Sequence, residues 1–366
     1  MATIEQGLGT GVSFALSDEQ RSLRELAREF AAKEIRPKEA AYDEAMQHPA
    51  DLIAKAHELG LMNLHVPEEY GGPGLSIFDG MLVGEELYWG CSGIGTSISA
   101  NGLGAGPVIG FGSDEQKRQW LRPLIEEPIL CSFGLSEPGA GSDVASMKTT
   151  AVRDGDEYVL NGSKTFITNA GYAAWTVVFA KTDPKGGAGG MSAFALQDVV
   201  VPASNRLGGE GQGFKIAMQT LDFTRPGTAV GAVGVAQAAY ELAVQYAKER
   251  VTFDMPIAMH QGVNFMIADM ATEIEASRLL CWQAGWMLDQ GYGRKATLYS
   301  SFAKRFAADT AMKVTTDAVQ VFGGYGYMKE YPVEKLMRDA KLFQIYECTS
   351  QIQRLVIAKE IFIPRG

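Results

Sequence analysis

The sequence predicts an α+β protein that is mostly helical, with three successive domains. We expect an N-terminal α-helical domain (1–128), a middle antiparallel β domain (129–207) and a C-terminal four-helix bundle (208–366). Apolar residues recur at helical spacing before and after the middle segment, and β-rich runs separated by Gly-rich turns fill that segment. Such segregation of helices and strands is typical of an α+β fold.

The composition is that of a folded protein with an acidic surface. Hydrophobic residues make up 46% of the 366 residues, charged residues make up 21%, and the net charge is −10. The absence of a long basic run argues against a nucleic-acid partner. The four cysteines and four histidines are dispersed, so neither a disulfide framework nor a metal site is expected.

The N-terminal sequence lacks the basic and apolar regions of a signal peptide, and no apolar run is long enough to cross a bilayer. We therefore expect a cytoplasmic protein, or a mitochondrial matrix protein if the chain is a processed eukaryotic form.

The N-terminal domain begins with a predicted helix at 17–35. Ser17 and Gln20 form a capping-box pattern at its start, and Pro37 marks its end. Similar helical periodicity predicts three more helices, at 51–62, 80–90 and 114–125. Pro and Gly residues predict a loop at 66–76. GLGAG (102–106) lies among helical residues and predicts close packing between helices.

The middle domain carries the strand signals. Two β-rich runs flank Asn161-Gly162, which predicts a hairpin over 158–168. Further strands are predicted at 175–181 and 192–202, and KGGAGG (185–190) predicts the turn between them.

The C-terminal domain reads as long helices at 229–250, 266–291 and 296–324, with a last helix after Glu347. The first is rich in small residues on the face that meets its neighbours. Thr224 and Pro226 are residues typical of a helix start, which would place Arg225 beside a helix N-terminus. Arg225 there suits an anionic ligand, or an ion pair with Asp222. The stretch 249–261 is an interhelical linker.

Two loops could bind a cofactor. FGLSEPGAGSD (133–143) offers close backbone approach and free N–H groups that can hold a pyrophosphate, although it could equally be an ordinary connection. It is not GxGxxG and opens no βαβ unit, which excludes a Rossmann site. TFITNAG (165–171) reads as a strand ending in a polar turn, whose aromatic and hydroxyl groups could meet a flat ring or simply pack.

Glu347, in IYECTSQIQR (345–354), is the candidate base. An isolated Glu is usually a solvated surface acid. Here Ile345 and Tyr346 would exclude water, and desolvation raises the pKa of a carboxyl group into a range useful for a base.

Taken together, the chain resembles the acyl-CoA dehydrogenase family from about residue 15 to 362, and most closely its medium-chain and short-chain members. The resemblance is carried by motifs that occur in the family's order: VPEEYGG, LSEPGAGSD, NGSKTFITNA, GFKIAMQTLD, VFGG, EYPVEKLMRDAK and IYE-x-TSQIQR.

The resemblance implies non-covalent FAD and α,β-dehydrogenation of a straight-chain, medium-chain acyl-CoA to a trans-2-enoyl-CoA. Glu347 would take the α-proton while the β-hydrogen leaves as hydride to flavin N5. It further implies electron-transferring flavoprotein as acceptor, and a homotetramer or homodimer. Two alternatives stay open: an acyl-CoA oxidase that uses O2, and a catalytically impaired flavin- or CoA-binding homologue.

The resemblance also assigns residues by matching motifs. Those implied to bind the cofactor are Phe133, Leu135, Ser136, Gly141, Ser142, Phe166, Ile167, Thr168, Arg250, Val251, Thr252, Phe253, His260, Gln261, Gln320, Val321, Phe322, Gly323, Gly324, Thr349, Ser350 and Gln351. Those implied to bind the substrate are Ser142, Asp222, Phe223, Thr224, Arg225, Tyr346 and Cys348. Small residues of 93–104, such as Ser99, match the acyl pocket.

One position supports the assignment of the base, and two features depart from the family pattern. Relatives that carry their base on the helix have Glu where this chain has Thr224, so Glu347 as the base is internally consistent. Cys348 replaces the Gly that usually follows the base. Two strands are expected to be missing between 192–196 and 198–202, a loss of about thirty residues judged from typical strand lengths.

Overall fold

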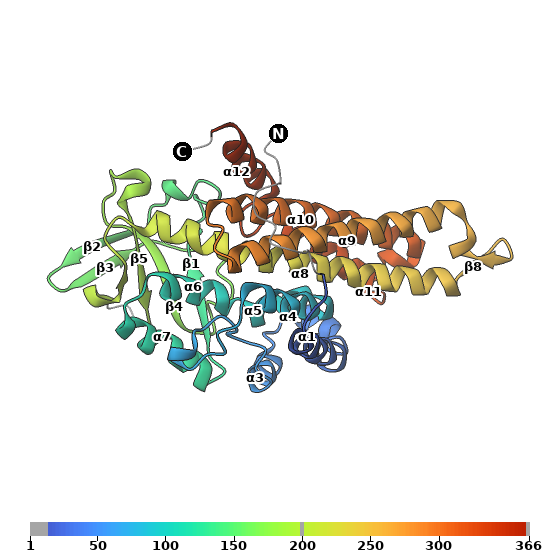
Figure 1. Ribbon diagram of the computed structural model, residues 1–366, viewed down its shortest axis with the longest axis horizontal. Coiled ribbons are helices and arrows are strands. Elements are labelled where there is room, and N and C mark those ends of the chain that lie inside the picture. The colour runs from blue at the N-terminus through green and yellow to red at the C-terminus, as the bar shows by residue number, and fades with distance from the viewer. Residues whose placement is uncertain (1–13, 198–200, 364–366) are drawn as a thin grey trace.

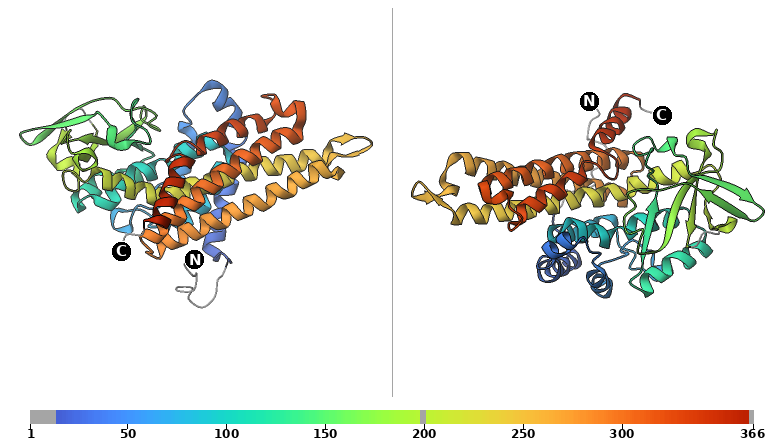
Figure 2. Two further views of the ribbon diagram at one scale, coloured as in Figure 1. Left: turned by 90° about the horizontal axis from the view of Figure 1, so that it is seen from above. Right: turned by 180° about the vertical axis from the view of Figure 1, so that it is seen from behind.

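A computed structural model describes residues 14–197 and 201–363. The molecule is elongated, with a β-sheet at one end, a long helical bundle that reaches the other end, and the N-terminal helices packed along the side of the bundle (Figure 1). The turned views in Figure 2 show the same arrangement. The predicted fold class, two helical domains around a small β domain, is confirmed.

The N-terminal domain is built from short helices. Its elements are α1 (Asp18–Phe30), η1 (Ala31–Ile35), α2 (Glu39–Ala45), α3 (Ala50–Glu58), η2 (Glu68–Tyr70), α4 (Ile77–Gly90), α5 (Ser92–Ser99), α6 (Asn101–Phe111) and α7 (Asp114–Glu126). The capping box of Ser17 and Gln20 is present as predicted. Gly104 of α6 does pack closely, but against a strand, because a Cβ there would lie 2.7 Å from Cys131 Sγ.

The sheet follows α7. Its strands are β1 (Leu130–Gly134), β2 (Thr150–Asp154), β3 (Glu157–Asn161), β4 (Ala173–Lys181), β5 (Met191–Leu196), β6 (Val201–Pro202) and β7 (Arg206–Leu207), in the order β6-β3-β2-β4-β5-β7 with β1 paired to β4. The antiparallel arrangement holds for β2–β3, β3–β6, β4–β5 and β5–β7, whereas β1 and β2 run parallel to β4.

The hairpin predicted at Asn161-Gly162 is wrong. The hairpin turns instead at Gly155, and residues after Asn161 leave the sheet. Gly162 passes so close to Thr149 that a Cβ would lie 2.3 Å from its Oγ1. Lys164 then donates to Leu135 O at 3.1 Å, which draws this segment onto the loop after β1. Tertiary contacts therefore override the local turn signal, and TFITNAG is a loop rather than a strand.

The C-terminal domain is helical apart from one short two-stranded hairpin. Its elements are α8 (Gly213–Glu249), β8 (Val251–Thr252), β9 (Met255–Pro256), η6 (Ile257–Met259), α9 (Gln261–Asp289), α10 (Arg294–Phe322), η7 (Gly323–Tyr327), α11 (Pro332–Phe343) and α12 (Ser350–Phe362). Helix α11 was not predicted, although Pro332 in its first turn is a helix-start signal. It packs on α8 and α10, and α12 crosses the bundle on α10 (Figure 1).

Helix α8 corrects the expectation that Thr224 and Pro226 begin a helix. The helix starts at Gly213, and Pro226 lies inside it. Burial explains this, because α8 is covered by α4, α9, α10 and α11, and tertiary packing overrides local propensity. Small residues allow this packing, as predicted: a Cβ on Gly234 would lie 2.2 Å from Glu85 O of α4.

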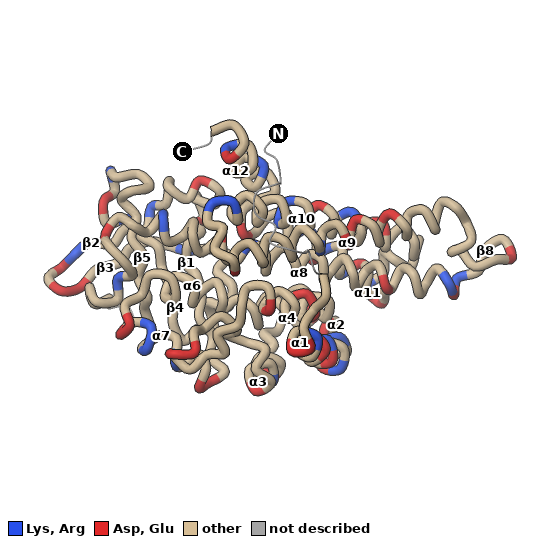
Figure 3. Tube along the Cα trace, in the orientation of Figure 1, with Lys and Arg blue, Asp and Glu red and all other residues tan. Residues whose placement is uncertain are grey.

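Both signs of charge are interspersed along the elements (Figure 3). Within the described residues, no helix combines the length and apolarity needed to span a membrane.

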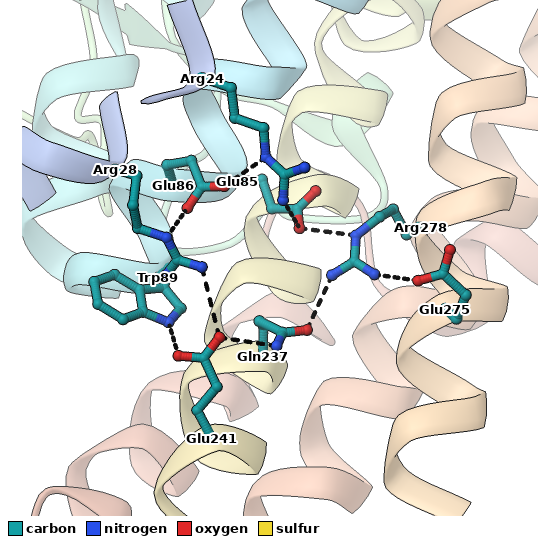
Figure 4. Close-up of polar contacts among 9 residues, drawn as sticks. All are labelled: Arg24, Arg28, Glu85, Glu86, Trp89, Gln237, Glu241, Glu275 and Arg278. Atoms are coloured by element: carbon teal, nitrogen blue, oxygen red, sulfur yellow. Dashed lines mark hydrogen bonds and ion pairs between the residues drawn. The ribbon is translucent and has the colours of Figure 1, made fainter. Parts of the chain in front are cut away.

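A buried ionic network joins four helices (Figure 4). Glu85 and Glu86 of α4 are each 2% exposed. Arg278 Nε of α9 lies 2.9 Å from Glu85, and Arg24 Nε of α1 lies 2.7 Å from Glu86. The network is completed by other side chains of α1, α4, α8 and α9: Arg28, Trp89, Gln237, Glu241 and Glu275.

The network predicts a strong dependence of stability on Arg278. In Arg278→Leu, the one ion-pair partner left to Glu85 among the described residues is Arg24 at 3.9 Å. We expect the free energy of unfolding in urea to fall by about 3 kcal/mol, because an insufficiently compensated buried charge is costly. The matched control is Arg122→Leu, which breaks an exposed pair with Glu126 and should change stability by at most about 0.5 kcal/mol. Equal unfolding midpoints for the two variants would contradict the prediction.

Candidate active site

A cavity of about 160 Å³ lies between the N-terminal helices and the start of the bundle. Its wall is mostly apolar and comes from the segment 61–66, α4, residues 96–103 and α8. Among the predicted site residues, the structure brings these to its lining: Thr168, Phe223, Thr224, Tyr346 and Glu347. Ser99 lines it as well, as expected for the small residues of 93–104.

Glu347 reaches this cavity from the turn between α11 and α12. Thr224 Oγ1 of α8 lies 3.1 Å and 3.0 Å from the two carboxylate oxygens, so its one proton can be donated to either. Burial raises the pKa of Glu347 above its ordinary value, although the hydrogen bond from Thr224 and the charges of Arg225 and Lys304 oppose the rise. The group is therefore a partly desolvated carboxyl held against the hydroxyl of Thr224, and Thr228 acts on its pKa in the same direction.

Ile345 and Tyr346 were expected to exclude water from Glu347, and the structure supports this for Tyr346 but not for Ile345. Tyr346 is half-buried, and its hydroxyl is buried without a hydrogen-bond partner in the described structure. Ile345 is 53% exposed and excludes no water from the cavity. Buried Tyr88 of α4 takes that place, because it lines the cavity beside Tyr346. Only the packing of α4 against the turn could reveal this.

The backbone at Glu347 is left-handed. Glu347 has φ 52° and Cys348 has φ 70°, a conformation that glycine adopts far more easily than residues with a Cβ. Gln353 Nε2 donates to Glu347 O at 3.3 Å, and Thr349 accepts from Ile352 N as the N-cap of α12. Burial raises the pKa of the Cys348 thiol, which disfavours the thiolate.

The two candidate cofactor loops lie together. Glu137 accepts hydrogen bonds from the backbone N–H groups of Lys148 and Thr149 and from Lys164 Nζ. Burial acts to raise the pKa of Glu137, but these bonds outweigh it and lower the pKa to about 2. Thr165 N also donates to Ser136 O at 3.1 Å. The loop after β1, which carries Leu135, Ser136, Gly141 and Ser142, is thereby joined to the loop of Phe166–Thr168, and Phe133 lies just before it in β1.

Phe166 stands beside the cavity with 95% of its surface exposed and a φ of 56°. Neighbouring Thr168 lines the cavity itself, and Asn169 anchors the loop by donating to Ser97 O at 2.8 Å. An exposed aromatic ring on an anchored loop fits a planar ligand such as a flavin.

A second group of predicted cofactor residues lies at the far end of the bundle, near β8 (Figure 1). A pocket of about 500 Å³ is lined there by Arg250, Thr252, Val321, Phe322, Gly323 and Gly324. His260 lies 3.3 Å from Thr252 Oγ1, whereas Val251 and Phe253 are exposed. Gln261 begins α9, and Gln320 is exposed on α10. The bundle separates this group from Phe166 and Glu347.

Of the last predicted cofactor residues, only Gln351 is exposed. Thr349 uses its hydroxyl to cap α12, and Ser350 is 2% exposed.

Asp222 and Arg225 form an ion pair, one of the two alternatives considered for Arg225. Arg225 is 3% exposed and lies in mid-helix, so it is not beside a helix N-terminus. Thr297 of α10 donates to Asp222 Oδ2 at 3.0 Å.

Thr228 also lines the cavity and was missed, whereas Thr96 belongs to the 93–104 stretch expected there. Thr228 follows Thr224 by one helical turn, so the i, i+4 spacing could have indicated it. Among the described residues, no group of three or more His, Cys, Asp or Glu side chains could hold a metal ion.

Comparison with known proteins identifies the class. The sequence matches three successive family descriptions: "Acyl-CoA dehydrogenase, N-terminal domain" at 17–128, "middle domain" at 132–221 and "C-terminal domain" at 211–362. The chain therefore belongs to the acyl-CoA dehydrogenase family, whose members are FAD-dependent oxidoreductases.

Individual relatives cover nearly the whole chain. The cyclohex-1-ene-1-carbonyl-CoA dehydrogenase of Geobacter metallireducens is 44% identical, over 95% of this chain and 99% of its own. Butyryl-CoA dehydrogenase from Megasphaera elsdenii superimposes with a TM-score of 0.92 at 40% identity, over 96% of this chain and 100% of its own. A chain in a structure described as the electron transferring flavoprotein of Acidaminococcus fermentans superimposes with a TM-score of 0.93 at 42% identity, over 96% of this chain and 100% of its own.

The alignment with the Geobacter relative extends over 381 positions but includes only 95% of the 366 residues of this chain, so the relative has residues that this chain lacks. The comparison does not place them in the chain, and the expected shortening of the β domain stays a prediction. The expected junction includes residues 198–200, which lie outside the described residues.

The left-handed backbone predicts that Cys348→Gly stabilises the protein. Glycine avoids the steric penalty of a Cβ, so we expect a gain of about 1 kcal/mol in the free energy of unfolding in urea. Cys348→Ala is the control, because it removes the thiol but keeps the Cβ. A glycine variant no more stable than the alanine variant would show that the turn is unstrained.

Proposed function

We propose that this protein dehydrogenates an acyl-CoA thioester between its α and β carbons to give a trans-2-enoyl-CoA, with Glu347 as the base. The observation that carries the proposal is the Glu347 carboxylate, with its raised pKa, on the wall of a mostly apolar cavity that Thr168 of the candidate cofactor loop also lines. A base beside a cofactor loop in one cavity suits removal of two hydrogens from adjacent carbons.

Glu347 accepts the α-proton in this proposal. Burial supports the role, since a carboxylate with a raised pKa is a stronger base. The backbone N–H of Glu347 has no hydrogen-bond partner among the described residues. It is therefore free to donate to the thioester oxygen, which would stabilise the negative charge that develops when the proton leaves. FAD, when bound, supplies the acceptor for the β-hydrogen as hydride.

The FAD site proposed here requires two copies of the chain. Phe133, Leu135, Ser136, Phe166 and Thr168 would hold the flavin side. The group around Arg250 and Thr252 lies at the other end of the bundle, so it would serve the cofactor of a second copy. This separation supports a homodimer, or a tetramer made of two such dimers.

The cavity volume supports a short or medium acyl group. A cavity of about 150 Å³ accommodates one benzene molecule, and this one measures about 160 Å³. Straight chains of about four to eight carbons fit that estimate. The name of the Geobacter relative makes a six-membered ring a further candidate.

We propose electron-transferring flavoprotein as the electron acceptor. The similar chain in the Acidaminococcus fermentans structure supports this. Direct oxidation by O2 is the alternative to be tested.

Replacing the base should separate binding from chemistry. In Glu347→Gln, titration calorimetry should show acyl-CoA binding within about threefold of wild type, whereas anaerobic bleaching of bound FAD should slow by about 1,000-fold. The substrates are butanoyl-CoA, octanoyl-CoA and cyclohex-1-ene-1-carbonyl-CoA. The control is Glu126→Gln, which changes an exposed side chain on α7. Bleaching by Glu347→Gln at the wild-type rate would refute the assignment, and rapid reoxidation of the wild type in air would favour an oxidase.

Thr224 should tune the pH dependence. Its hydrogen bond stabilises the charged carboxylate, so its loss in Thr224→Val should raise the pKa of Glu347 further. The base acts when deprotonated, so the rate of FAD bleaching rises with pH, and this rise should move to higher pH in the variant. Thr224→Ser retains the donor and should keep the wild-type profile. Identical profiles for the valine and serine variants would contradict the prediction.

A further inference from the structure

Lys304 of α10 is a fully buried lysine, with 0% of its surface exposed. Its Nζ donates to Phe343 O at 2.7 Å and to Cys348 O at 2.6 Å. Among the described residues, no carboxylate lies within ion-pair distance of it. A lysine is rarely buried without such a partner, so its two carbonyl partners call for an explanation.

The two carbonyls bracket the segment that carries Glu347. Phe343 is the last residue of α11, where the negative end of the helix dipole favours a cation. Cys348 directly follows Glu347, at the end of the left-handed pair. No other hydrogen bond to either carbonyl is present in the described structure. One ammonium group therefore closes both ends of the turn.

This turn needs an external restraint. Two successive left-handed residues with side chains cost about 1–2 kcal/mol each. Such backbone persists where the surroundings over-determine it. Gln353 and Thr349 restrain the α12 side of the turn. Ser350 N donates to Gln344 O at 3.0 Å, and Gln344 Nε2 donates to Asp309 Oδ1 of α10 at 2.9 Å. Lys304 adds the two hydrogen bonds that join the carbonyls of Phe343 and Cys348 to α10.

We propose that Lys304 is a positioning residue for Glu347: its two hydrogen bonds hold the α11–α12 turn so that the carboxylate faces the cavity. The inference rests on the proposed function, because it assumes that the position of Glu347 matters for proton removal. The turn itself is open to a separate test.

The positive charge of Lys304 also acts electrostatically on Glu347. Glu347, Cys348, Arg225 and Asp309 are the titratable and charged groups that act on it. Burial lowers the pKa of Lys304 to about 8, so the ammonium form still predominates at neutral pH. This cation opposes the rise in the pKa of Glu347. Its removal should therefore shift the pH dependence of proton abstraction upward.

The central variant is Lys304→Met, which has a side chain of similar length without donors or charge. Proton abstraction is followed as exchange of the acyl-CoA α-hydrogens in D2O, detected by mass spectrometry, with a substrate whose β-carbon is replaced by sulfur. We expect exchange per bound FAD to fall by about 100-fold, as for a misplaced catalytic group, and its rise with pH to move to higher pH. Binding of the CoA thioester should change less than threefold.

Thr315→Val is the matched control, because Thr315 is buried in the same helix and donates only to carbonyls of that helix. It should lower stability without changing exchange or the pH profile. If Lys304→Met behaves like this control, with wild-type exchange per FAD, the proposal is overturned.

A double variant tests the turn directly. Glycine adopts the left-handed conformation at little cost, so Lys304→Met/Cys348→Gly should recover at least tenfold of the lost exchange. It also provides a folded sample if Lys304→Met alone unfolds. A double variant no faster than Lys304→Met, or unfolded as well, would count against the proposal.

Amide hydrogen exchange of the 343–350 peptide separates the two hypotheses. Lys304→Met should exchange these amides at least tenfold faster than wild type. If the wild type removes no α-hydrogen but the peptide still loosens in the variant, the proposed function fails and the restraint of the turn stands. Unchanged amide exchange would overturn the restraint itself.

Discussion

The central physical constraint in this protein is the burial of a carboxyl group at the end of a turn. Glu347 is half-buried in the cavity wall, and the groups that offset its desolvation come from α8 and α10 rather than from its own segment. Thr224 supplies the hydrogen bond, and Arg225 and Lys304 supply the positive charge. The site therefore exists only when these two long helices and the α11–α12 turn are packed together.

Helix α8 has a double function in this packing. Its N-terminal half presents Thr224 and Thr228 to the cavity, while its C-terminal half carries Gln237 and Glu241 of the ionic network. Gly234 between them lets the backbone of α8 touch α4. The same close approach that joins the N-terminal domain to the bundle thus fixes one wall of the cavity.

Some of the left-handed non-glycine positions lie at the proposed site, while Met46, Phe253 and Asp254 lie elsewhere. Phe166 on the candidate cofactor loop and Glu347 with Cys348 on the opposite turn all have left-handed backbone without being glycine. Strain of this kind persists where tertiary contacts over-determine the conformation. Lys164, Asn169, Gln353 and Lys304 supply such contacts through hydrogen bonds to the backbone of the same loops or of the elements they pack against.

The sequence by itself determined the order of the domains, most helices and the family motifs, because periodicity and caps such as Ser17–Gln20 are local. It also pointed to Glu347. It failed where distant contacts outweigh local preference: Pro226 sits inside α8 because the whole helix is buried, and Asn161-Gly162 forms no hairpin because Lys164 binds the loop after β1. Only the tertiary structure decided that Thr224 faces Glu347 and that Lys304 closes its turn. Thr224 and Glu347 are 123 positions apart in sequence, and Lys304 and Cys348 are 44 positions apart. The bond from Lys304 to Phe343 O also requires α10 to pack against the end of α11.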